Sequence, residues 1–136
     1  MNHNDSLTIL LKLLSMNYDD LHKLGIKVVY NKMIDEGYDV LGVYDNQEQN
    51  PQIMATRDGK RYVVVVRTAR FPNMGILLPI TAKAVKDYAS TCGAICLFAS
   101  VGIANGDGNT DEEMGQPNLN GNYIIRYEGL QPFPAY

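Results

Sequence analysis

Oxygen-bearing side chains occupy alternate positions at the start of the segment 107–118, and this spacing can supply ligands for Ca²⁺. Asp107, Asn109 and Asp111 match the first three ligand positions of a calcium-binding loop. The pattern then fails, because Glu112 stands where the sharp turn needs glycine and Asn118 stands where a bidentate glutamate is needed. We therefore expect a flexible acidic loop with no resident metal.

The remaining candidates for covalent, metal or cofactor chemistry are sparse. His3 and His22 are far apart in the sequence, with no acid or nucleophile signature beside them, so neither is given a catalytic role. Cys92 and Cys96 are expected to be buried free thiols, because a disulfide would have to close across a turn at Gly93. Two cysteines are too few for a structural zinc or iron–sulfur site, and no glycine-rich nucleotide motif occurs, so no cofactor is expected.

Positive charge is concentrated in one part of an acidic chain. The net charge is −3, yet residues 57–86 contain seven lysines and arginines and a single aspartate. Such a concentration can form an anion-binding surface. The candidates for binding an anion or nucleic acid are Arg57, Lys60, Arg61, Arg67 and Arg70.

A β-hairpin is predicted to position most of these residues. Asp58-Gly59 suits the positive φ values of a type I′ turn, and apolar β-branched residues flank it within the segment 51–68. A two-residue turn fixes the register, so Thr56 should face Arg61 and Gln52 should face Val65.

The other elements are predicted from periodicity and capping residues. Asn17 should cap a helix over residues 18–36, with Asp20 completing the cap and Gly37 ending the helix, and Thr81 should cap the helix 82–92. The apolar strand 62–66 should lie in the middle of the sheet and connect to the strand 94–101 by a right-handed crossover. A further helix is expected over 5–15, and further strands over 38–44 and 123–128. Together these elements predict one α/β domain over residues 1–136.

The hairpin resembles that of the PD-(D/E)xK superfamily of restriction-endonuclease-like nucleases. Pro51-Gln52 stands where that family has Pro-Asp, and Val65-Val66-Arg67 stands where it has Glu-x-Lys. The resemblance covers roughly residues 18–102 and implies a three-layer core, with a mixed central sheet flanked by helices in the order ααβββαββ. It also implies metal-dependent nuclease chemistry, but Gln52, Val65 and Arg67 lack the acids that bind a divalent cation and the lysine that assists the attacking water. We expect a degenerate member with the nuclease fold and without its metal site.

Two questions about this site stay open at the level of sequence. Asp39, Asp45 or Glu36 could rebuild a metal site from other positions, although nothing in the sequence places two of them opposite Gln52. Arg67 should emerge beside the family's pocket, where it could hold an anion or pair with an internal carboxylate, and the ion pair is favoured.

The favoured function is a non-catalytic binding or assembly module that forms a homo-oligomer. Tyr127, Phe133 and Tyr136 could dock onto another subunit, because a C-terminal tail without an internal strand partner is often buried by association. The alternative is a nucleic-acid-binding protein that uses the basic residues on phosphates. No apolar run is long enough to span a bilayer and no secretory signal is recognised, so we expect a cytoplasmic protein without a membrane partner.

Overall fold

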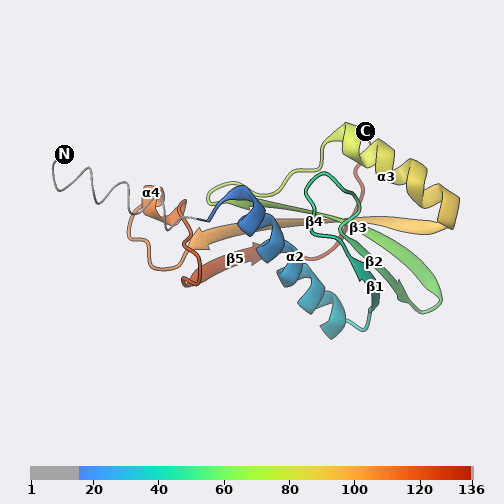
Figure 1. Cartoon of the computed structure of the whole chain (residues 1–136), viewed down its shortest axis with the longest axis horizontal. Helices are drawn as coiled ribbons and strands as arrows, with labels where there is room; N and C mark the ends of the chain where they lie inside the picture. The colour runs from blue at the N-terminus through green and yellow to red at the C-terminus, as the bar shows by residue number, and fades with distance from the viewer. Residues whose placement is uncertain (1–15, 136) are drawn as a thin grey trace.

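The computed structural model describes residues 16–135, which fold as a mixed sheet with α2 on one face and α3 on the other (Figure 1). The predicted helix 5–15 lies outside the described residues. The elements are α2 (Tyr18–Asp35), β1 (Asp39–Val43), β2 (Ile53–Arg57), β3 (Lys60–Arg70), α3 (Pro79–Cys92), β4 (Ala94–Asn105), α4 (Asp111–Met114), β5 (Tyr123–Tyr127) and β6 (Gln131–Pro132). The predicted α/β class is confirmed.

The strands are ordered β1-β2-β3-β4-β5 in a six-stranded sheet, and β6 also pairs with β4. The first three strands form an antiparallel meander, whereas β3 and β4 are parallel and are joined through α3. These two long strands run side by side through the molecule (Figure 1). A helix covers each face at β3, which explains why Val63–Val66 of this strand are fully buried.

The hairpin forms as the sequence predicts. Asp58 and Gly59 have φ values of 53° and 77°, as a type I′ turn requires. The predicted register is observed from Arg57, which faces Lys60, to Ile53, which faces Val64.

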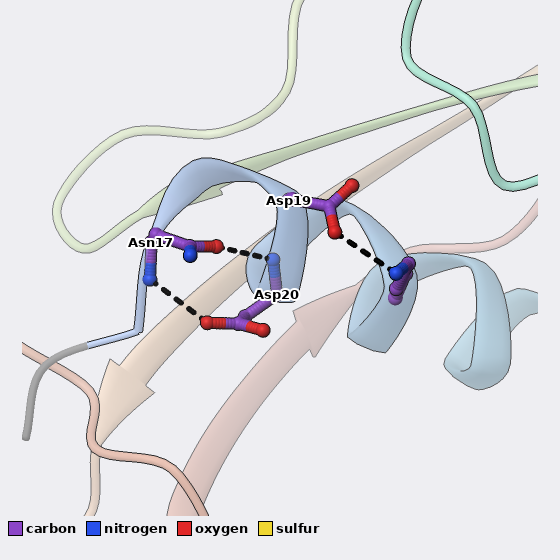
Figure 2. A network of polar contacts seen from close by, with 4 residues as sticks. Asn17, Asp19 and Asp20 are labelled. Atoms are coloured by element: carbon purple, nitrogen blue, oxygen red, sulfur yellow. Dashed lines mark hydrogen bonds and ion pairs between the residues drawn. The ribbon is translucent and has the colours of Figure 1, made fainter.

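The start of α2 is fixed by a reciprocal cap (Figure 2). The Asp20 backbone N–H donates to Asn17 Oδ1 at 2.8 Å, and the Asn17 backbone N–H donates to Asp20 Oδ2 at 3.1 Å. Asp19, which directly precedes Asp20, forms an exposed ion pair with Lys23 at 2.9 Å. Gly37, with φ of 88°, follows the end of the helix. The predicted cap and stop signals of this helix are confirmed.

The start of α3 differs from the prediction. The helix begins at Pro79, and Leu78 at the N-cap makes no side-chain hydrogen bond, so Thr81 lies within the helix and the predicted cap is wrong. Proline is favoured in the first helical turn because the N–H it lacks would have no partner there.

Two apolar clusters lie on the two faces of the sheet. The α2-side cluster contains Val64 and Val66 of β3 together with the inward face of the helix, and the α3-side cluster contains Val63 and Val65. Alternation along a strand produces this division, so odd-numbered residues of β3 belong to the α3 face.

The acidic segment folds into a short capped helix. Thr110 Oγ1 accepts from the Glu113 backbone N–H at 3.1 Å, and Glu113 Oε2 accepts from the Asn109 backbone N–H at 2.8 Å, so these side chains cap the one-turn helix α4. The predicted flexible loop is therefore a capped turn at this point. Cys92 and Cys96 are free, as predicted, but half-buried.

The C-terminal segment has partners within its own chain. β6 pairs with Leu97 and Phe98 of β4, so the assumption that the tail lacks an internal strand is wrong. Tyr127 packs against the α2-side cluster, where burial raises its pKa to about 12, and Phe133 packs against the α3-side cluster. Tyr136 lies outside the described residues.

Candidate functional site

The side chain of Gln52 completes the sheet directly before β2 begins. The Gln52 backbone N–H donates to the Val64 carbonyl at 2.9 Å, one residue away from the predicted partner Val65. Its side-chain Oε1 then accepts from the Val66 backbone N–H at 2.8 Å. Gln52 is fully buried, and its side chain thus satisfies a buried backbone donor that β2 does not reach.

The other end of the Gln52 amide is also hydrogen-bonded. Its Nε2 donates to the Gln49 carbonyl at 2.7 Å and to Asn50 Oδ1 at 2.9 Å. Because Val66 N–H can only donate and the Gln49 carbonyl can only accept, these partners fix the orientation of the amide. The glutamine is therefore held rigidly between β3 and the loop that precedes β2.

Arg67 joins the same network. Its Nη1 donates to Gln52 Oε1 at 3.2 Å and to the Val66 carbonyl at 2.9 Å, and its Nη2 donates to Asn50 Oδ1 at 2.8 Å. All three acceptors are neutral, and the ion pairs formed within residues 16–135 do not include Arg67. The internal carboxylate favoured from the sequence is therefore not found in this part of the chain. Burial lowers the pKa of the guanidinium, as desolvation of a cation does.

The third position of the resemblance, Val65, is apolar and fully buried against α3. The acidic residues that could rebuild a metal site from other positions do not lie together either. Asp39 faces Thr56 across β1 and β2, Asp45 lies in the loop after β1, and Glu36 follows the end of α2. Within residues 16–135, no three His, Cys, Asp or Glu side chains come together as a metal site would require.

A cavity of about 540 Å³ lies beside Arg67, Thr68 and Ala69, beyond the last residue of β3 that pairs with β2. Tyr18 and His22 of α2 line one part of it. The loop between β3 and α3 lines another part through residues 73–76 and 78. The cavity is thus built from segments far apart in sequence, next to the Gln52–Arg67 network.

Two buried polar side chains of this cavity have an atom without a hydrogen-bond partner among residues 16–135. They are His22, through Nε2, and Thr68, through Oγ1, with exposed fractions of 6% and 7%. Burial, and then repulsion by Arg67, lowers the pKa of His22, although Asp19 and Asp45 oppose the shift. Thr68 Oγ1 is packed against Gly25 of α2, so the unpaired atom that bears on the cavity is His22 Nε2. Buried polar atoms are paired in most proteins, so this nitrogen makes the cavity a candidate binding site.

The five basic candidates do not form one strip. Lys60 and Arg61 begin β3 at the hairpin turn, and Arg67 and Arg70 lie toward its other end, so Arg61 and Arg67 are about 20 Å apart along an extended strand. Arg57 stacks on the Tyr38 ring at 4.1 Å. Arg70 donates to the backbone carbonyl of Met16, and Arg67 is held in the network at the cavity.

His22 and Thr68 were not identified as site residues from the sequence. Such positions are typical of an ordinary core: His22 is a single histidine on the apolar face of a helix, and Thr68 lies two residues after a run of four valines. The one available signal was that both are polar residues on faces that must be buried.

Residues 19–133 match a family described as a domain of unknown function (DUF8840), and the chain belongs to this family. No curated protein matches the chain. Among the helices of residues 16–135, none is long and apolar enough to cross a membrane.

Proposed function

We propose that this chain is a non-catalytic binding domain with a degenerate PD-(D/E)xK-like frame. The observation that carries the proposal is the use of Gln52, which stands at the position of the metal-binding aspartate. Its oxygen accepts from Val66 N–H at 2.8 Å and Arg67 Nη1 at 3.2 Å, so it is already committed to the structure of the sheet.

The order and direction of the helices and strands support a PD-(D/E)xK-like fold. A helix, three antiparallel strands, a second helix and a strand parallel to the third follow one another in the order that the resemblance implies. The chemistry of the site argues against a retained cation, because Mg²⁺ and Ca²⁺ bind through anionic and other hard oxygen ligands. Val65 offers no oxygen, and Arg67 would repel a cation.

Assembly into a homo-oligomer is part of this proposal. β1 is the edge strand next to β2, and it exposes Leu41 and Val43, with 67% of the Leu41 surface accessible; the exposed Tyr44 directly follows the strand. Unprotected apolar edge strands favour pairing with another chain. Sedimentation equilibrium should show an oligomer that Leu41→Lys weakens. A monomer at all accessible concentrations would remove assembly from the proposal and leave the binding role intact.

Nucleic-acid binding remains the alternative, and the separation of the basic residues argues against it. Lys60 and Arg61 at the hairpin are the exposed members of the set. Binding through them should weaken steeply with salt, since each neutralised phosphate releases a counterion. Retardation of labelled DNA or RNA at low salt that is lost in Lys60→Gln/Arg61→Gln would favour this alternative.

The cytoplasmic location likewise stays a prediction from the sequence.

The proposal is tested by nuclease assays on single- and double-stranded DNA and RNA with Mg²⁺ or Mn²⁺. We expect no cleavage above that of a mock purification. Metal-dependent cleavage that co-purifies with the chain and is lost in Gln52→Ala or Arg67→Ala would overturn it.

A further inference from the structure

We propose that the cavity beside Arg67 binds a small organic carboxylate that carries an apolar group. This inference rests on the proposed function, because it names the ligand class of a domain that binds without cutting. It is carried by a partly buried cation without a carboxylate partner and by the unpaired Nε2 of the buried His22, which lines the same cavity.

The hydrogen bonds of Arg67 leave part of its guanidinium free. Arginine has five N–H groups. Two on Nη1 donate to Gln52 Oε1 and the Val66 carbonyl, and one on Nη2 donates to Asn50 Oδ1. The Nε–H and the second Nη2–H have no partner among residues 16–135. Because one guanidinium edge matches the two oxygens of a carboxylate, the free pair suits a monovalent oxyanion.

His22 supplies a further polar contact within the same cavity, because its Nε2 can donate when it carries the proton. Thr68 also lines the cavity, but its Oγ1 is packed against Gly25 of α2 and is not counted as a ligand contact. The two carboxylates that influence His22, those of Asp19 and Asp45, line a neighbouring hollow together with Lys23 and do not line this cavity. The cavity therefore holds one fixed positive charge and no carboxylate of its own among the described residues.

The other residues that line the cavity indicate which chemical group the carboxylate carries. Tyr18, Met74, Ile76 and Leu78 contribute apolar surface. The cavity volume of about 540 Å³ is that of a small-molecule site, in which apolar walls surround a few polar groups. A single cation balances a monoanion better than a phosphate dianion, so we favour a carboxylate with an aliphatic or aromatic group.

The test is an NMR titration of the isotope-labelled wild-type chain at about pH 7.5, where His22 with its lowered pKa is neutral. Hexanoate is the probe, and hexanamide and inorganic phosphate are the comparison ligands. We expect saturable shifts from hexanoate at the Arg67 Nε–H and at the amides of residues 67–69 and 73–76, with at least about tenfold weaker binding of hexanamide. Equal binding of hexanamide, preference for phosphate, or no saturable shift would overturn the inference.

Variants locate the binding without depending on Arg67, whose replacement also breaks the network to Gln52. His22→Phe keeps an aromatic ring and removes the polar atoms, and we expect it to weaken hexanoate binding about tenfold or more. Arg61→Gln removes an exposed charge at the hairpin and should leave binding unchanged. Unchanged binding in His22→Phe would place the ligand elsewhere and overturn the inference. Absence of hexanoate binding by the wild-type chain, with blank nuclease assays, would overturn this inference alone, whereas metal-dependent cleavage would overturn the proposed function.

Discussion

Replacing Gln52 with leucine tests whether this side chain is a structural member of the sheet. Leucine has a similar volume, so it fills the same space without hydrogen-bonding. The change removes the acceptor of the buried Val66 N–H and one acceptor of the Arg67 guanidinium. The carbonyl of Gln49 and the side chain of Asn50 also lose a donor, but both residues are exposed and can bind water.

The expected loss in the free energy of unfolding follows from these contacts. A buried N–H left without an acceptor costs about 1–3 kcal/mol, and a lost bond to a charged group costs about 1.5–3 kcal/mol. Burying leucine in place of an amide returns about 1–2 kcal/mol. We therefore expect Gln52→Leu to lower the free energy of unfolding by about 2–4 kcal/mol, which corresponds to about 6–12 °C in Tm for a chain of this size.

Urea denaturation followed by circular dichroism measures this loss. Gln49→Leu is the matched control, because Gln49 is exposed and its side chain should contribute less than about 0.5 kcal/mol. A double-mutant cycle with Arg67→Met should give a coupling of about 1 kcal/mol or more, since the two side chains share one network. A loss in Gln52→Leu no larger than in the control would refute the structural role of Gln52.

Three further predictions concern the positions around this network. Val65→Glu buries a carboxylate at a fully buried site, and we expect it to destabilise the fold by about 3 kcal/mol or more, whereas Val43→Glu on the exposed edge should change urea stability little. Gly25→Ala places a Cβ only 1.7 Å from Thr68 Oγ1, so it should destabilise by about 1–3 kcal/mol. Adding Thr68→Ala should recover part of this loss, because the Oγ1 contact is removed while the Thr68 Cβ stays 2.9 Å away; no recovery would contradict this contact. The pKa of His22 is lowered from 6.5, mainly by burial, so below about pH 6.5 the unfolded chain binds more protons than the folded chain and stability should fall as pH decreases. The urea midpoints measured at about pH 7.5 and pH 5.5 should therefore differ less in His22→Asn than in the wild-type chain. An equal difference in the two chains would contradict the lowered pKa.

The sequence predicted the framework well because its signals are local. Asp58-Gly59 specifies a turn by backbone conformation alone, and Asn17 with Asp20 specifies a helix start three residues apart. The start of α3 was missed because the competing signals Thr81 and Pro79 both suit a helix N-terminus, and sequence alone does not rank them.

The candidate site was less predictable because it depends on where β2 begins. The type of residue at position 52 was informative, but its hydrogen bond to Val66 N–H follows from a shift of pairing that the hairpin register does not reveal. The cavity joins α2, β3 and the loop before α3. The orphan atoms of His22 and Thr68 become visible only when these elements are packed together.

The proposed function depends most on the hydrogen-bond network that stands at the start of β2 in place of a metal ion. The most direct measurement is paramagnetic broadening of the wild-type NMR spectrum by Mn²⁺. We predict that the amide signals of Val66 and Arg67 keep their intensity at Mn²⁺ concentrations that broaden exposed acidic positions such as Asp111 and Glu112. Selective, saturable broadening at Val66 and Arg67, reversed by excess Mg²⁺, would show that a metal ion binds there and would contradict the proposed function.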